Sequence, residues 1–183
     1  IEVEEKATGE LMAGAGVGTD GTSFMASVSE NNWLGRGIRL QSSLNVSEEK
    51  LSGSVQVANP NYNYTDNMVY GSLSLASSDM KNSSGYESSS TGISLGTEFE
   101  QYENFYLSPS FSFTHERIEA EDTASAKIKK MDGTFTNIDF GYGIMVDKRN
   151  QPFQPTSGYR SKFLQQLPIL QDSSSLLNGY DLS

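Results

Sequence analysis

Apolar and polar residues alternate along most of the chain. From Ile38 to Val46 the even positions are mostly apolar, and the odd positions between them are polar. The same alternation runs through 51–58, 105–114 and 137–146. Since successive side chains of a strand point to opposite faces, each segment has one apolar face and one polar face. The i, i+3, i+4 spacing of a helix explains none of these runs. The pattern therefore predicts an all-β protein.

Turn-forming residues divide the chain into about ten strands. Glycine supplies the positive φ that tight turns need, and proline ends a strand because it has no N–H for the ladder. The predicted strands cover roughly 8–18, 22–33, 36–47, 50–60, 67–77, 91–101, 104–118, 134–147, 158–169 and 175–183. Most span about 10–12 residues, close to the roughly 9–11 that a tilted strand needs to cross a bilayer. We therefore expect an antiparallel up-and-down meander of transmembrane strands.

The connections between the strands suggest an orientation. Two long polar segments, 78–90 and 119–133, follow the fifth and seventh predicted strands, and Ser88-Ser89-Ser90 in the first of them is expected to be flexible loop. In a meander both lie on one side, and outer-membrane barrels place their long loops outside the cell. The opposite strand ends gather aromatic residues, which we interpret as a membrane-interface girdle rather than as rings that are simply common in strands. These residues are Trp33, Tyr62, Tyr64, Tyr102, Phe105, Phe153 and Tyr159.

Composition restricts the partners and the chemistry. The 183 residues carry 13 Lys+Arg and 23 Asp+Glu, a net charge of −10, which argues against binding nucleic acid because a phosphate backbone needs a basic surface. Cysteine is absent, which excludes disulfides and thiolate metal sites. No apolar run approaches the roughly 18 residues of a transmembrane helix.

No group of residues predicts catalysis. His115 is the only histidine, and it precedes a long loop among charged residues, where solvation is expected rather than metal binding. The pair Glu48-Glu49 has no nearby partner to raise a pKa. The glycines Gly14, Gly16 and Gly18 lead into a turn and another strand, whereas a phosphate-binding loop leads into a helix. We expect no enzyme activity, no catalytic residue, no metal and no cofactor.

Several motifs follow one another in a recognisable order. Thr8-Gly9 enters the first strand, Asn31-Asn32-Trp33-Leu34-Gly35-Arg36-Gly37 separates the second and third, and Val57-Ala58-Asn59-Pro60 ends the fourth. A later segment runs from Asp147-Lys148-Arg149-Asn150 through Phe153-Gln154-Pro155-Thr156-Ser157-Gly158, of the form D-x-R-x…P-T-x-G. In this order and over most of the chain, these motifs resemble the barrel of the BamA family, the bacterial outer-membrane protein insertases.

The resemblance implies a sixteen-stranded transmembrane β-barrel, of which residues 8–183 form the N-terminal part with about ten strands. Residues 1–7 resemble the end of the last POTRA domain, which precedes the barrel, so the chain is expected to be a fragment. The implied location is the outer membrane of a Gram-negative bacterium. The implied partners are unfolded β-barrel precursors, accessory lipoproteins of the assembly complex and membrane lipids. A TamA-like translocation and assembly factor, a passive outer-membrane pore and a soluble adhesin are the alternatives.

The first strand is the candidate site. In a BamA-like barrel it meets the last strand at a weak seam, or lateral gate. In this sequence one face of the strand carries small apolar residues and the other is nearly bare, and glycine packs little. We expect its backbone to template the terminal strand of an incoming precursor. The templating residues are Gly9, Glu10, Leu11, Met12, Ala13, Gly14, Ala15, Gly16, Val17 and Gly18.

Four basic residues in or near the predicted turns have two interpretations. They either contact lipid phosphates at the periplasmic rim or are ordinary lumen and turn charges: Arg36, Arg39, Lys148 and Arg149.

Overall fold

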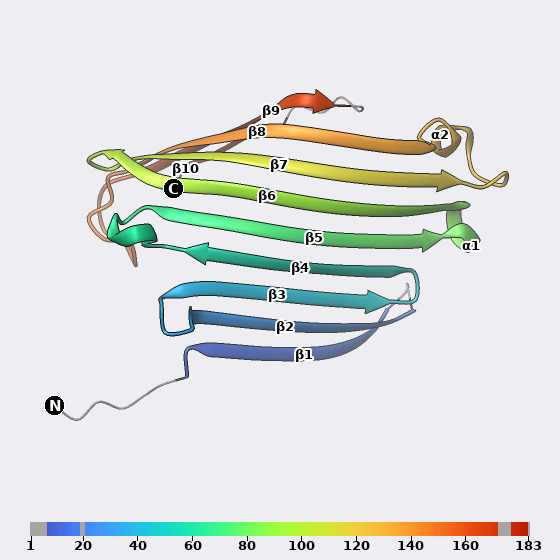
Figure 1. Ribbon diagram of the computed structural model, residues 1–183, viewed down its shortest axis with the longest axis horizontal. Helices are drawn as coiled ribbons and strands as arrows, with labels where there is room; N and C mark the ends of the chain where they lie inside the picture. Colours follow the sequence, from blue (N-terminus) through green and yellow to red (C-terminus); the bar gives the residue numbers. More distant parts are fainter. Residues whose placement is uncertain (1–6, 19–20, 172–176, 183) are drawn as a thin grey trace.

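The chain forms one antiparallel sheet in which each strand pairs with the next in sequence (Figure 1). The computed structural model describes residues 7–18, 21–171 and 177–182. The strands are β1 (Gly9–Gly18), β2 (Gly21–Trp33), β3 (Ile38–Ser47), β4 (Lys50–Asn59), β5 (Met68–Met80), β6 (Tyr86–Tyr102), β7 (Phe105–Ala120), β8 (Gly133–Asp147), β9 (Arg160–Gln171) and β10 (Leu177–Leu182). The predicted all-β antiparallel meander is confirmed. Of the segment expected to end a POTRA domain, 1–7, only Ala7 lies within the described residues.

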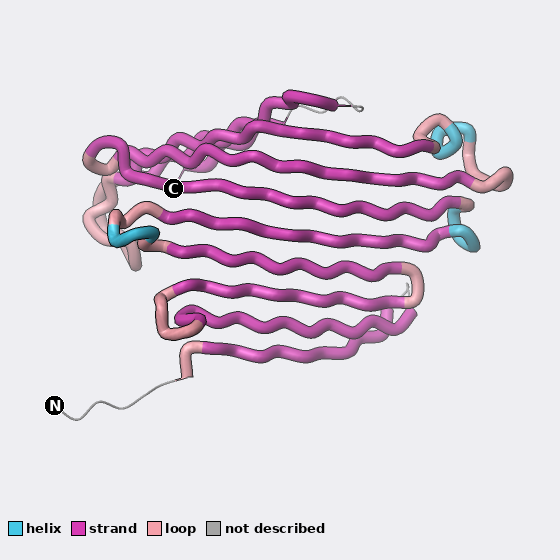
Figure 2. The backbone as a smooth tube through the Cα atoms, in the orientation of Figure 1, coloured by secondary structure: helices cyan, strands magenta, loops and turns pink. Residues whose placement is uncertain are grey.

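In the described residues, short helical segments lie in the connections between strands (Figure 2). They are the 3₁₀ turn η1 (Tyr62–Tyr64), α1 (Lys81–Ser84) and α2 (Ala126–Lys129). None of the helices in the described ranges is long and apolar enough to span a membrane.

Two neighbouring rows of paired residues show why the alternation produces two different faces. One row crosses eight strands through Leu11, Val28, Ser42, Val55, Leu73, Ile93, Phe113 and Ile138. The next row crosses the same strands through Met12, Ser27, Ser43, Ser54, Ser74, Gly92, Thr114 and Asn137. One face is therefore apolar and the other is lined by hydroxyl and amide groups, as the period of two requires.

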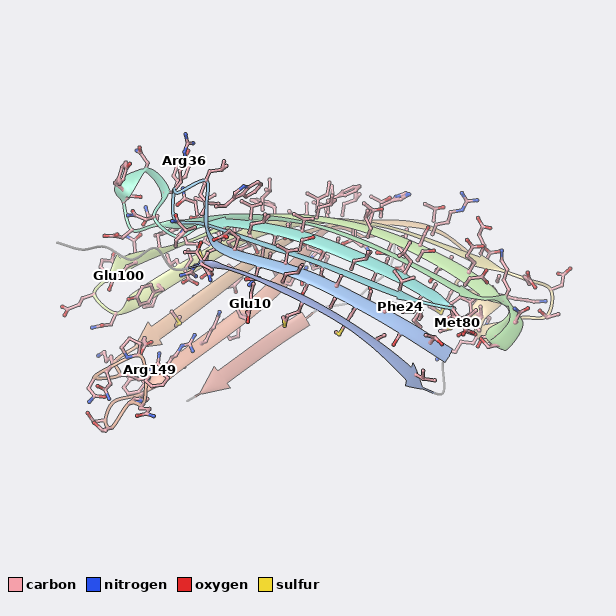
Figure 3. The ribbon with its side chains drawn as sticks, turned by 90° about the horizontal axis from the view of Figure 1, so that it is seen from below. Glu10, Phe24, Arg36, Met80, Glu100 and Arg149 are labelled. Carbon is pink, nitrogen blue, oxygen red and sulfur yellow. The ribbon has the colours of Figure 1, made fainter. Side chains whose placement is uncertain are left out.

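The sheet is curved, and the polar face is concave. Figure 3 shows the curvature, with β9 and β10 folded beneath the other strands. Gln56 in β4 and Lys162 in β9 line the same hollow of about 650 Å³, so polar-row side chains from distant strands face a common space. Within the described part of the chain, β1 and β10 remain the two edges and are not paired with each other. The sheet is thus a trough that is not closed into a barrel.

The apolar convex face has no covering layer among the described residues. Leu95 and Phe111 are 63% and 56% exposed on this face, and none of the large side chains whose burial is described is fully buried. A soluble sandwich would bury these residues against a second sheet. A single sheet with one apolar face instead needs an apolar surrounding, such as the hydrocarbon of a bilayer.

The prediction of a long loop at 78–90 is wrong. β5 continues to Met80 and β6 begins at Tyr86, so the connection is only α1 and Gly85, which has a φ of +72°. The serines 88–90, expected to be flexible, are paired with both β5 and β7. Serine on both faces hides the alternation, and this is why the sequence pattern missed the strand ends. Lys81 and Glu87 form an ion pair of 2.5 Å beside this turn, and the hydrogen bond to the carboxylate raises the pKa of Lys81.

The connections alternate between the two ends of the trough. The β3–β4, β5–β6 and β7–β8 connections share one end, where α1 and α2 lie in Figure 1. The β2–β3, β4–β5, β6–β7 and β8–β9 connections share the other end, called the aromatic end below because all seven predicted girdle residues lie there. The connection at 148–159 is as long as that at 121–132. Loop length therefore does not distinguish the two ends, contrary to the expected asymmetry.

Candidate functional site

The first strand is an edge strand, and its whole length is exposed. Each residue from Gly9 to Gly18 pairs with a residue of β2 without a break in register. On its other side β1 has no partner among the described residues. All ten residues are exposed, including Leu11 at 75% and Val17 at 86%. An edge of this kind carries a row of N–H and C=O groups that another strand can pair with.

The pairing of β1 with β2 determines which of its backbone groups face the free edge. The Asn31 N–H donates to the Thr8 carbonyl oxygen at 3.2 Å, so Thr8 and Asn31 belong to a hydrogen-bonded pair. Such pairs alternate with non-hydrogen-bonded pairs along an antiparallel ladder. The even-numbered residues of β1 are therefore bonded to β2. The groups directed to the free edge belong to the odd-numbered residues, namely Gly9, Leu11, Ala13, Ala15 and Val17.

Side-chain packing between β1 and β2 is sparse. A Cβ atom built on Gly14 would lie 3.3 Å from Cγ of Met25, and one built on Gly18 would meet no atom within 4 Å. In the middle of the sheet, by contrast, the rings of Phe111 and Phe140 pack with their centroids 5.1 Å apart. Strand β1 is consequently held by its ladder and by few side-chain contacts, as the glycine content predicted.

The beginning of β1 is fixed by the Asn31-Asn32 motif. The Asn31 Nδ2 group donates a second hydrogen bond to the Thr8 carbonyl, at 3.3 Å. The Asn32 N–H donates to Oε1 of Glu30 at 2.8 Å, and Oδ1 of Asn32 accepts from the Gly37 N–H at 2.7 Å. Sequence reasoning identified Thr8-Gly9 and this motif separately but missed that they contact each other. The contact anchors the start of the edge strand at the aromatic end.

The seven aromatic residues lie at one end but do not form one cluster. They are spread over the connections from β2 to β9, on the left in Figure 1. Tyr64, Phe153 and Tyr102 are 93%, 80% and 70% exposed. The rings of Tyr102 and Phe105 contact each other, with centroids 6.2 Å apart. The seven rings therefore share one rim of the sheet, and their contact with a membrane interface stays a prediction.

The motif at 147–158 builds the β8–β9 connection. Nε and Nη2 of Arg149 donate to the two carboxylate oxygens of Asp147 at 2.8 and 2.7 Å, and the Asp147 carboxylate raises the pKa of Arg149. Nη1 of Arg149 also donates to the Pro152 carbonyl at 3.4 Å. Oδ1 of Asn150 accepts from the Thr156 N–H at 3.1 Å. These bonds hold the exposed ring of Phe153 on a braced loop, a role that the sequence motif alone did not reveal.

Nowhere in 7–18, 21–171 and 177–182 do three His, Asp or Glu side chains come together to hold a metal ion. His115 lies within β7, and its Nδ1 is 3.1 Å from Oγ1 of Thr136. The chemistry that β1 can perform is the pairing of its backbone with another extended chain.

Comparison with solved structures supports the fold. The crystal structure of BamA from Haemophilus ducreyi lacking POTRA domains 1-3 matches with a TM-score of 0.64 and 19% sequence identity. The match covers 92% of this chain and 36% of the BamA chain, so this chain spans about a third of the solved protein. At this identity the likeness shows the fold, a part of a BamA-type barrel.

A family model identifies the chain. The model that describes the Omp85 superfamily domain matches residues 32–178, which is most of the sequence. Omp85 proteins reside in outer membranes, where they are non-enzymatic membrane assembly factors. The match begins at the Asn32 turn and continues through the ladder into β10. By this match, the chain belongs to the Omp85 superfamily.

Proposed function

We propose that this chain is the N-terminal barrel wall of an outer-membrane protein insertase, and that β1 templates the terminal strand of an incoming β-barrel precursor. The observation that carries the proposal is the edge of β1, whose odd-numbered residues direct their N–H and C=O groups away from β2. Main-chain pairing is indifferent to side chains, so one edge suits precursors of many sequences.

The weak packing of β1 supports a seam that opens. A strand that exchanges partners must release one ladder and form another at little net cost. The glycines Gly14, Gly16 and Gly18 add no side-chain contacts that would hold the seam closed, and each weakens a strand by roughly 0.5–1 kcal/mol relative to alanine. The ladder of β1 with β2 meanwhile keeps the template straight and in register.

The proposal also includes the surroundings of the trough. The apolar convex face would contact lipid, and the aromatic end would lie at the periplasmic boundary, since the segment 1–7 that resembles a POTRA end precedes β1 there. Accessory lipoproteins and membrane lipids are the further proposed partners. A TamA-like translocation and assembly factor would have the same fold and the same edge and is the alternative within this proposal.

Site-directed crosslinking in the full-length protein tests the proposal. Met12→Cys places a thiol on β1, and a cysteine in the terminal strand of a stalled precursor is its partner. Phe111→Cys is the mid-sheet control, because Met12 and Phe111 are similarly exposed, at 58% and 56%, but Phe111 lies in the middle of the sheet, on its convex face. We expect crosslinks at Met12→Cys and none at Phe111→Cys.

The crosslinking outcomes and two other measurements separate the alternatives. Crosslinks that form only at the mid-sheet position would contradict templating by β1. A passive pore would form no crosslink at either position and would conduct ions in planar bilayers. A soluble adhesin would leave the membrane fraction on washing with alkaline carbonate.

A further inference from the structure

A hollow lies between two neighbouring turns at the aromatic end. It encloses about 560 Å³ between the β2–β3 turn and the η1 turn that follows β4. Ile38 pairs with Trp33, and Asn59 pairs with Val69 in the rows of the convex face. The hollow, called the turn-end hollow below, therefore opens on the outer surface and not on the concave face. It is lined by Gly35, Arg36, Ile38, Asn59, Asn61, Asn63 and Tyr64.

Two asparagine amides and one guanidinium supply hydrogen-bond donors to this hollow. Oδ1 of Asn59 accepts from the Asn61 N–H at 3.1 Å, and Oδ1 of Asn61 accepts from the Asp66 N–H at 3.0 Å. Because the oxygen ends of both amides are bound within the turn, their NH₂ ends are directed away from it. Arg36 adds a guanidinium with five N–H groups and no acceptor.

The charge in the hollow is positive. No Asp or Glu is among its lining residues, and within the described ranges Arg36 is joined to no carboxylate by an ion pair. Figure 3 shows Arg36 standing away from the strands, beside the loop that carries η1. In a chain of net charge −10, a guanidinium set among amides has the character of an anion site.

We propose that the turn-end hollow binds the phosphate group of a membrane phospholipid. Guanidinium and amide donors match the oxygens of a phosphate, and charge-assisted hydrogen bonds of this kind are the strong ones. The exposed ring of Tyr64 and the Ile38 side chain provide apolar contact beside the phosphate, as at a membrane interface. This inference rests on the proposed placement of the convex face in lipid.

Lipid retention by the full-length protein tests the inference. The purified protein in detergent is titrated with phosphatidylglycerol, and bound lipid is counted by native mass spectrometry. Arg36→Gln is expected to weaken retention roughly tenfold, the effect of losing one charge-assisted contact. Arg39→Gln removes the same charge from the concave face, since Arg39 pairs with Ala58 on β4, and is expected to retain lipid like the wild type. Equal retention by all three proteins, or equal loss in both variants, would overturn the inference.

Two further measurements control for loss of folding in the variants and identify the source of the phosphate. Asn59→Ala should also weaken retention, and far-UV circular dichroism shows whether each variant keeps its strands. Inorganic phosphate added alone should not displace the lipid at equal concentration; if it does, the hollow holds a free anion and the headgroup assignment is overturned. The measurement uses no precursor. Failure of the Met12 crosslink with intact lipid retention therefore contradicts only the proposed insertase function, whereas absent retention with intact crosslinking contradicts only this inference.

Discussion

The ring of Tyr70 lies directly over Gly96 of the neighbouring strand, on the concave face of the trough. The two residues pair across β5 and β6, and a Cβ atom at position 96 would fall on the tyrosine ring. Glycine at this position therefore makes room for a tyrosine ring on the polar face. Aromatic rings that cover a strand glycine supply the packing that the glycine lacks.

Gly96→Ala is consequently expected to destabilise the barrel by about 1–3 kcal/mol, the usual cost of overpacking. Urea unfolding of the full-length protein in detergent measures the loss. Tyr70→Ala should remove the clash, so that adding Gly96→Ala to it costs little. Additive effects of the two substitutions would show that the ring does not cover the glycine.

Proline scanning distinguishes the two sides of β1. Ala15→Pro removes an N–H directed to the free edge, so the ladder with β2 persists while precursor crosslinking falls about fivefold, the effect of one hydrogen bond. Gly16→Pro removes an N–H that binds β2 and is expected to lower the stability of the strand instead. The readouts are the Met12 crosslink yield and amide hydrogen exchange of β1. A reversed pattern would show that the assignment of odd and even residues is wrong.

Gly158 of the β8–β9 connection is expected to be more sensitive to substitution than Gly37 of the β2–β3 turn. Its φ is +98°, and a Cβ atom there would collide with the Lys148 carbonyl. Gly37 also has a positive φ, +67°, but a Cβ atom on it would meet nothing within 4 Å. Gly37→Ala should therefore lower the free energy of unfolding only by the strain of a left-handed alanine, about 1–2 kcal/mol. Gly158→Ala should lower it by more. Equal losses of stability in urea would contradict a role for the close approach.

Arg149→Lys tests the brace of the same connection. Lysine keeps the charge but cannot bind both oxygens of Asp147 as the planar guanidinium does. Hydrogen exchange at the Thr156 amide should accelerate by roughly fivefold, because the loop then opens more often. Lys148→Gln removes the neighbouring charge and leaves the fork intact, so it should exchange at the wild-type rate. Unchanged exchange in Arg149→Lys would mean that Asn150 holds the loop alone.

The fold was predictable because period-two alternation is strong wherever one face is apolar. Alternation did not predict the strand from Ser88 to Ser90, because both faces of β6 carry serine there. Only the pairing of these residues with β5 and β7 reveals the strand. Turn residues were located correctly near Pro60, since proline interrupts a ladder regardless of context.

The candidate site was predictable only in part. The exposed glycine-rich edge follows from the pattern of β1. Which backbone groups point outward depends on the bond between Asn31 and Thr8, and the brace of Asp147 by Arg149 depends on a loop geometry. The turn-end hollow joins Arg36 with Asn59 from separate turns, and no spacing in the sequence records that juxtaposition.

The separation of odd and even residues along β1 also governs how this strand can drift during evolution. Every amino acid except proline presents the same backbone N–H to a pairing strand. Codon changes at Leu11, Ala13, Ala15 or Val17 therefore alter the apolar side chains and leave the backbone groups available for pairing. Alanine codons lie a single base from those of proline, however. Most leucine codons also differ from a proline codon by one base, so Leu11, Ala13 and Ala15 are the positions where a single nucleotide change can remove an outward-directed N–H group.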